Sequence, residues 1–170
     1  MKSIAAILLA LALLPGCVRQ WSYVRDTGSN TADPIGICMP ADLAARSDIS
    51  EAIGAWRWSL RGWRPVVVNG AACTITVEEA EPSACDTKDA LACADRLGGH
   101  WIYLVRGRWT TDPRGVMLHE IGHVLGAQHL GGTLMAPNLI TGRYSCPDLE
   151  TVIQVAAYQR ANLTLFSWCY

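Results

Sequence analysis

The order of apolar and polar residues along the chain predicts an α+β protein. Short apolar runs rich in valine, isoleucine and aromatic residues predict strands at 34–39, 65–68, 73–77 and 100–105. Apolar residues that recur three and four positions apart predict three main helices, at about 48–63, 113–125 and 148–162. We therefore expect residues 34–170 to form one domain with a twisted mixed sheet of about four to five strands and three main helices.

Local residue choices predict where two of these helices begin and where one ends. Asp48 and Glu51 stand three positions apart, the spacing of a capping box at a helix start. Asp112 and Pro113 suit the N-cap and the first position of the next helix. Gly126 can adopt the left-handed backbone conformation that ends a helix, so we expect that helix to stop there.

Three tryptophans lie on or near the first predicted helix. Helical spacing places Trp56 and Trp63 on its apolar side, so we expect both to pack in the core and Trp58 to lie at the surface. Residues 80–99 are polar, and we expect them to form a loop that a disulfide closes.

The N-terminal residues predict export. An apolar stretch from Ile4 to Leu14 has the layout of a secretory signal and is too short to span a bilayer as a mature helix. It ends in Leu14-Pro15-Gly16-Cys17, which resembles a bacterial lipobox. We expect residues 1–16 to be a lipoprotein signal peptide, Cys17 to carry the lipid, and residues 17–33 to form a tether. The alternatives are an ordinary cleavage site that leaves Cys17 as a thiol, or an uncleaved anchor.

The remaining cysteines predict an oxidising compartment. Excluding Cys17 leaves six, an even number that indicates three disulfides in an exported protein. None of the six has a CxxC spacing, so we do not expect them to bind a metal. The favoured pairs are Cys85 with Cys93, Cys146 with Cys169, and Cys38 with Cys73.

The charge of the chain limits the classes of partner that we expect. There are 14 basic and 15 acidic residues, and the sequence shows no basic patch. Nucleic acid is therefore not expected as a partner, and membrane association is expected through the N-terminal lipid rather than through surface charge. The N-terminal segment and the cysteines together predict a bacterial lipoprotein anchored at the outer membrane or the cell surface, and not a cytoplasmic protein. We expect it to be a monomer.

One segment, His119-Glu120-Ile121-Gly122-His123-Val124-Leu125-Gly126-Ala127-Gln128-His129, has the spacing of a metal site. Two histidines four apart on a helix differ by about 40° around the axis and roughly 6 Å along it, so both imidazoles can reach one ion. A turn at Gly126 allows His129 to return as a third ligand. Three neutral imidazoles leave one coordination position open, which is typical of catalytic rather than structural zinc. His100 stands alone at a strand start and is expected to be structural.

Glu120 predicts the chemistry of this site. It lies about 100° around the helix from His119, next to the face of the helix that carries the two histidines. Zinc with three uncharged ligands can lower the pKa of a bound water to roughly 7. We expect Glu120 to accept the proton of this water as general base and to return it to the leaving amine. The segment therefore predicts a zinc-dependent endopeptidase with one catalytic Zn²⁺, acting on peptides or proteins through a zinc-activated water.

The extended HExxHxxGxxH motif with Met135 downstream resembles the metzincin metallopeptidases, and their matrixin-like branch most closely. The resemblance implies a zincin-like fold in which Thr133-Leu134-Met135-Ala136-Pro137 forms the Met-turn beneath the metal. It extends to residues 52–77, which are similar to the first helix and following strands of matrixins, and to residues 148–158, which are similar to their last helix.

The same resemblance implies an extended peptide substrate bound along an edge strand, with one main selectivity pocket. The pocket is expected at Leu118, Pro137, Asn138 and Leu139. Tyr144 lies beyond the turn, where some metzincins carry a tyrosine that stabilises the oxyanion, but its spacing differs and we expect a structural role. Two alternatives stay open: a lipoprotein that binds zinc without turnover, and an amidase that acts on cell-wall peptides.

Overall fold

The computed structural model describes residues 33–70, 72–138 and 142–169, and its β-strands form one sheet. The strands are β1 (Ile35–Cys38), β2 (Val66–Val68), β3 (Ile75–Ala80), β4 (Ala92–Ala94) and β5 (Trp101–Val105). Their order across the sheet is β2-β1-β3-β5-β4. Neighbours run parallel except β4, which is antiparallel to β5 and lies at the edge.

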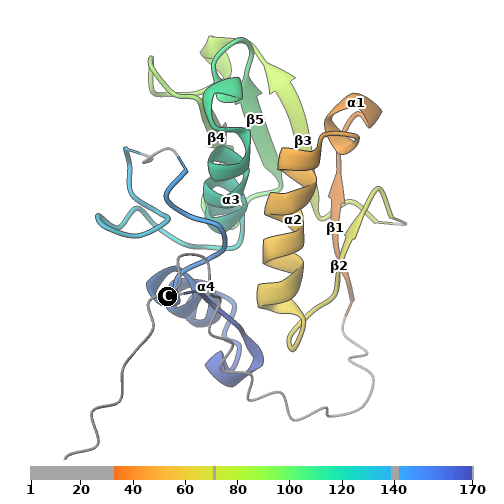
Figure 1. The fold of residues 1–170 in the computed structure, drawn as a ribbon, viewed down its shortest axis with the longest axis vertical. Helices are drawn as coiled ribbons and strands as arrows, with labels where there is room; N and C mark the ends of the chain where they lie inside the picture. Colours follow the sequence, from red (N-terminus) through yellow and green to blue (C-terminus); the bar gives the residue numbers. More distant parts are fainter. Residues whose placement is uncertain (1–32, 71, 139–141, 170) are drawn as a thin grey trace, which may run out of the picture.

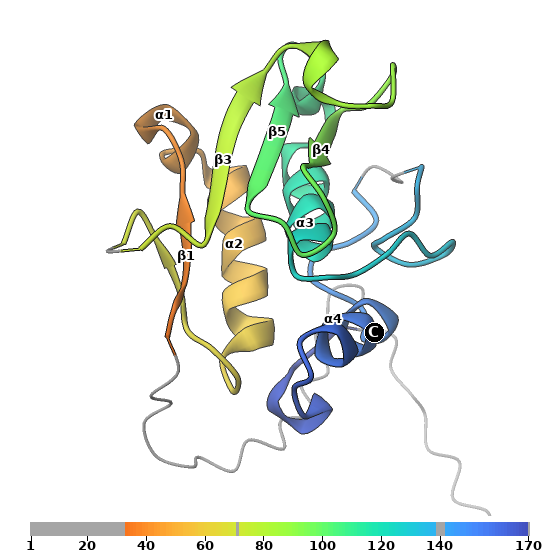
Figure 2. The same ribbon diagram turned by 180° about the vertical axis from the view of Figure 1, so that it is seen from behind.

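Three main helices accompany this sheet. They are α2 (Ser47–Leu60), α3 (Pro113–Val124) and α4 (Leu149–Tyr158), and a single short turn of helix, α1 (Ala41–Ala44), precedes them. The two opposite views in Figure 1 and Figure 2 show α2 and α3 side by side on one face of the sheet, with α4 beyond one end of it. Three short 3₁₀ helices complete the described chain: η1 (Pro82–Ala84), η2 (Trp109–Thr111) and η3 (Leu163–Leu165). The mixed α+β architecture, with five strands and three main helices, agrees with the pattern of the sequence.

The hydrophobic core lies between the sheet and helices α2 and α3. Ile75 and Val77 of the central strand β3 are almost completely buried, whereas Thr76 between them is only half-buried, as expected for a strand with one face on a core. Trp56 is fully buried, and its Nε1–H donates to the carbonyl oxygen of Leu118 at 3.0 Å. This hydrogen bond joins α2 to α3 and satisfies the indole donor inside the core.

The other two tryptophans of this region are half-buried. Trp63 packs against the core and stacks on Phe166, with ring centroids 5.4 Å apart. Trp58 is more enclosed than the surface position expected from its helical spacing, and the guanidinium of Arg61 lies 6.0 Å from its ring centroid.

The predicted capping box at the start of α2 is wrong. The helix begins at Ser47, so Asp48 lies inside the first turn rather than at the N-cap. Its carboxylate binds the guanidinium of Arg46 and accepts from the N–H of Ile49. Glu51 instead forms an ion pair with Arg114 of α3 at 3.0 Å. The pairing with Arg46 competes for the carboxylate, which sequence spacing alone does not reveal.

The loop expected at 80–99 contains the predicted Cys85–Cys93 disulfide, but the expectation that the segment has no regular structure is wrong. β3 continues to Ala80, η1 follows, and β4 forms within the segment. The three residues of β4 are Ala, Cys and Ala, which have no intrinsic preference that marks a strand. Pairing with β5 decides their conformation.

Three disulfides join the cysteines in the pairs expected from the sequence: Cys38–Cys73, Cys85–Cys93 and Cys146–Cys169. They indicate an extracellular or otherwise oxidising environment. In the described part of the chain, no helix is both long enough and apolar enough to cross a bilayer. The expected signal peptide, the lipidated Cys17 and the tether up to residue 32 lie outside the described residues.

Candidate metal centre

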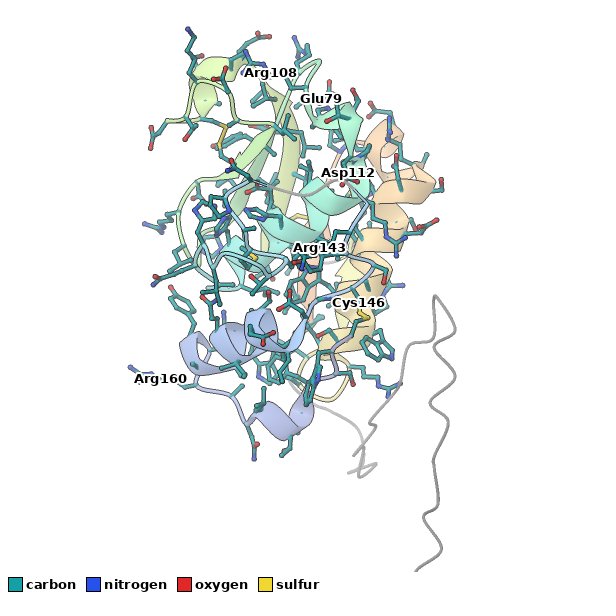
Figure 3. The ribbon with its side chains drawn as sticks, turned by 60° about the vertical axis from the view of Figure 1, so that its left-hand side comes forward. Glu79, Arg108, Asp112, Arg143, Cys146 and Arg160 are labelled. Atoms are coloured by element: carbon teal, nitrogen blue, oxygen red, sulfur yellow. A yellow bond between two sulfur atoms is a disulfide. The ribbon has the colours of Figure 1, made fainter. Side chains whose placement is uncertain are left out.

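Helix α3 carries two of the candidate ligands, and its start is set as the sequence predicts. The carboxylate of Asp112 accepts from the N–H of Gly115 at 3.1 Å, and Pro113 occupies the first turn. Figure 3 shows Asp112 at the beginning of this helix. The helix is buried on nearly every side between the sheet, α2 and the following segment, so His119 and His123 are held on a rigid element.

The end of α3 turns the chain back toward the same site. Gly126 has a φ of 106°, in the left-handed region, and its N–H donates to the carbonyl of His123. The N–H of Ala127 donates to the carbonyl of Gly122, which completes a Schellman motif. A Cβ at position 126 would collide with the ring of Tyr158, so both the backbone angle and the space require glycine here.

The three histidines meet through their Nε2 atoms. Nε2 of His123 lies 3.0 Å from Nε2 of His119 and 3.1 Å from Nε2 of His129. The Nδ1 atoms of the two helical histidines face backbone carbonyls, that of His119 facing Leu134 O at 2.9 Å and that of His123 facing Ala127 O at 2.8 Å. A ring nitrogen that donates to a carbonyl must carry the proton, so the Nε2 atoms of both rings present lone pairs to one another.

Because the site is buried, a proton held between these Nε2 atoms is unfavourable. His119 is 7% exposed, and desolvation lowers its pKa from 6.5 to about 4. Desolvation also lowers the pKa of His123. Both imidazoles are therefore neutral near pH 7, which is the form that binds metals.

The donor set fits a zinc ion. The candidate ligand atoms of the three histidines lie within 4.8 Å of one another. Nitrogens bound tetrahedrally to zinc at about 2.0–2.1 Å stand roughly 3.3 Å apart, close to the separations of the Nε2 atoms. The Nδ1–H groups bonded to carbonyls provide the outer contacts that orient metal-binding imidazoles. The three histidines form a candidate metal site.

Glu120 lies beside this site and is 6% exposed. Burial raises the pKa of its carboxyl from 4.5 to about 8, an effect that a hydrogen bond with the backbone of Ala94 in β4 partly offsets. Its Oε2 atom is buried and has no hydrogen-bond partner in the structure. A buried carboxylate oxygen without a partner is costly unless a ligand, water or proton completes it.

The segment expected to form a Met-turn, residues 133–137, packs against α3. Met135 is fully buried, and a Cβ at Gly122 would lie only 2.5 Å from its sulfur, so helix and turn are in close contact. The N–H of Leu134 donates to Asp148 Oδ2 at 2.6 Å, which anchors the turn to the start of α4.

A cavity of about 1060 Å³ adjoins the histidines. Its lining includes all three histidines, Glu120, the three residues of β4, Pro137 and Asn138. Leu118 does not line it, contrary to expectation: its side chain is fully buried in the core, and Val116, two residues earlier and therefore on nearly the opposite side of α3, lines the cavity instead. Leu139 lies outside the described residues.

Two further residues keep the structural roles that were expected. Nδ1 of His100 lies 3.0 Å from the carbonyl oxygen of Thr74, and His100 is not part of the histidine group. The hydroxyl of Tyr144 donates to the carbonyl oxygen of Gly132 at 2.8 Å.

Sequence reasoning missed two contributors to the site, Ala94 and Asp148. Nothing marks Ala94 in the sequence, because its contact with Glu120 depends on where β4 pairs. Asp148 was recognised only as the start of the last helix, although an aspartate near the Met-turn was a usable signal. Comparison with known protein families finds no match for the chain, and comparison with curated proteins finds none either.

Proposed function

We propose that the protein is a zinc-dependent endopeptidase of the metzincin type. The observation that carries the proposal is the orphaned Oε2 of Glu120 beside three converging imidazoles, in the wall of an open cavity. Three histidines suffice to hold an ion without closing its coordination. A purely structural site has no need of a buried carboxylate at this position.

His119, His123 and His129 would hold the zinc ion through Nε2. When bound, zinc would supply a Lewis acid that polarises the scissile carbonyl and lowers the pKa of water. A cation held by the three histidines would favour the ionised form of Glu120, whose carboxylate would then accept a proton from the attacking water at Oε2 and deliver it to the nitrogen of the departing amine. The second carboxylate oxygen, oriented by the backbone of Ala94, would keep Oε2 aimed at the site.

The edge strand β4 supports a peptide as the substrate. It pairs with β5 on one side only, and Ala92, Cys93 and Ala94 all line the cavity. Backbone groups on an unpaired strand edge can bind an extended chain by adding it to the sheet. A peptide seated there would pass directly beside Glu120, whose carboxyl contacts the same strand.

The disulfides bear on the compartment in which the protein acts. The disulfides support a protein that works outside the cytoplasm, and we propose the exported, lipid-anchored form expected from Cys17, at the outer membrane or the cell surface.

The test is cleavage of a mixed peptide library by zinc-loaded protein, with Glu120→Gln as the isosteric inactive variant. Exposed Glu150→Gln removes the same charge away from the cavity and is the matched control. We expect the unmutated protein and Glu150→Gln to cut and Glu120→Gln, with equal zinc content, to lose at least about 100-fold in rate. Folded, zinc-loaded protein that cuts no peptide would contradict the proposal. Cleavage of cell-wall fragments alone would favour the amidase, and no cleavage of either would favour a binding lipoprotein.

A further inference from the structure

Arginine side chains gather where α2 ends and the chain enters β1. Arg57 and Arg61 are one helical turn apart, and Arg64 follows at the next turn. Nε of Arg57 donates to the carbonyl of Val66 at 3.0 Å, at the start of β2. Nε of Arg64 donates to the carbonyl of Asp33 at 2.6 Å, immediately before β1. We call Arg57, Trp58, Arg61 and Arg64 the arginine surface.

Acidic residues are few at this end of the molecule, where Asp148 and Glu150 stand at the start of α4. All 15 acidic residues of the chain lie outside 52–77 and 151–170, whereas these segments contain four arginines, the fourth being Arg160. The two segments pack together, because the hydroxyl of Ser59 donates to the carbonyl of Ser167 at 2.6 Å. Figure 3 shows Arg160 at the lower end of the molecule, pointing outward. Asp33 lies beside the arginine surface, because its backbone carbonyl accepts a hydrogen bond from Nε of Arg64.

Apolar groups accompany these charges. The guanidinium of Arg61 lies 6.0 Å from the ring centroid of half-buried Trp58. Leu165 is 37% exposed, and its backbone lies against Gly62 next to Arg61. Tryptophan beside arginine is typical of surfaces at the headgroup level of a bilayer, where an apolar ring and a cationic group can both be satisfied.

We propose that the arginine surface binds the headgroups of anionic phospholipids and holds the domain against a bilayer. Its position supports a membrane rather than a soluble polyanion, because Arg64 contacts Asp33, the described residue that follows the segment proposed to carry the lipid. Charge complementarity and the adjacent tryptophan are the recognising features. The cavity of the metal centre is lined by no residue of 52–77 or 151–169, so it stays accessible when this end is docked. The inference rests on the proposed lipid anchor and is independent of the proposed peptidase activity.

The test is binding of the mature chain from residue 17, carrying Cys17→Ser so that it cannot be lipidated, to vesicles of phosphatidylcholine with and without phosphatidylglycerol. Each arginine near an anionic surface contributes about fivefold in affinity, so Arg57→Gln with Arg61→Gln should weaken binding to the anionic vesicles about 25-fold. The control pair Arg106→Gln with Arg108→Gln removes the same charge at the other end of the molecule, where Figure 3 shows Arg108. We expect the control to bind as the unmutated chain does, and binding to pure phosphatidylcholine to be the same for all variants.

Arg61→Gln alone provides a second variant. The described interaction of the Arg61 side chain is a contact with the ring of Trp58, so we expect the variant to fold. It should weaken binding to anionic vesicles about fivefold. Equal losses in the arginine-surface and control variants would overturn the proposal, as would equal binding to both kinds of vesicle. Binding to single-stranded DNA without binding to anionic vesicles would also overturn it and would assign the surface to a soluble polyanion.

Discussion

The carboxylate of Asp148 and the N–H of Leu134 form a hydrogen bond of 2.6 Å that connects helix α4 to the metal centre. The carbonyl of the same leucine accepts from Nδ1 of His119 at 2.9 Å. Asp148 also caps α4, since its other oxygen accepts from the N–H of Thr151 at 2.9 Å. One carboxylate therefore binds both the start of a helix and the residue whose carbonyl orients a candidate metal ligand.

Replacing Asp148 should weaken both functions. We expect Asp148→Ala to lower the free energy of unfolding by about 3 kcal/mol, through the lost cap and the lost bond to Leu134, and to lower zinc affinity about 10-fold. Urea unfolding and zinc competition with a chelator would measure the two effects. Glu150→Ala, at an exposed position in the same turn of α4, is the control. Equal zinc affinity in the two variants would show that the Met-turn keeps its position without Asp148.

Gly126→Ala should disrupt the return of the chain to His129. The residue has a φ of 106°, and a Cβ there would overlap the ring of Tyr158. Gly107→Ala is a matched control, because Gly107 has a φ of 75° and open space around its Cβ position. We expect the control to lose about 1 kcal/mol from backbone conformation alone, and Gly126→Ala to lose more than about 2 kcal/mol and to bind zinc more weakly. If the two variants were equally stable, the overlap with Tyr158 would have no energetic effect.

His119 should destabilise the metal-free protein in mild acid, whereas the raised pKa of Glu120 acts in the opposite direction over the same range. Burial lowers the pKa of His119 in the folded state to about 4, below its ordinary value of 6.5, so the unfolded chain takes up a proton first as pH falls. The stability contributed by neutral His119 is complete above pH 6.5 and is lost as pH falls toward 4. At pH 5 we expect the contribution of His119 to be about 2 kcal/mol less favourable than at pH 7, measured by urea unfolding after chelation as the difference between the unmutated protein and His119→Gln.

A pair of variants separates this effect from other titrations. Compared with the unmutated protein, His119→Gln should be relatively more stable at pH 5 than at pH 7, whereas His100→Gln, which replaces an exposed histidine, should keep the pH dependence of the unmutated protein. An identical pH dependence in both variants would exclude His119 as its source.

The three disulfides should differ in their effect on stability. Cys38 and Cys73 close a loop with a sequence separation of 35, whereas Cys85 and Cys93 are separated by 8. Because a longer loop restricts the unfolded chain more, the double serine variant of the first pair should be less stable by about 1 kcal/mol than that of the second. Urea unfolding of both variants would measure the difference. The opposite order would indicate that contacts in the folded state, rather than loop entropy, dominate.

Several parts of the fold and the site follow from short stretches of sequence. Asp112 and Pro113 begin α3 and Gly126 ends it as expected, because caps and left-handed glycines act through neighbours within one turn. The histidine spacing brings the three Nε2 atoms together for the same local reason. The capping box at Asp48 is wrong because a nearby arginine competed for the carboxylate.

Other features depend on segments far apart in the chain, and no local sequence pattern predicts them. β4 is a strand because β5 pairs with it, and Val116 rather than Leu118 faces the cavity because of how α3 is rotated against the sheet. The contact of Ala94 with Glu120 and the bond of Asp148 to the Met-turn arise only when these elements pack.

The sequence by itself determined the candidate ligands, the neighbouring carboxylate and the turn between them, since helical periodicity and glycine conformation are local properties. The tertiary structure decided how deeply Glu120 is buried, which strand borders it, and that Arg64, beyond the end of α2, contacts the chain before β1. Desolvation, strand pairing and surface charge depend on which distant residues come into contact, and only the packed chain specifies those contacts.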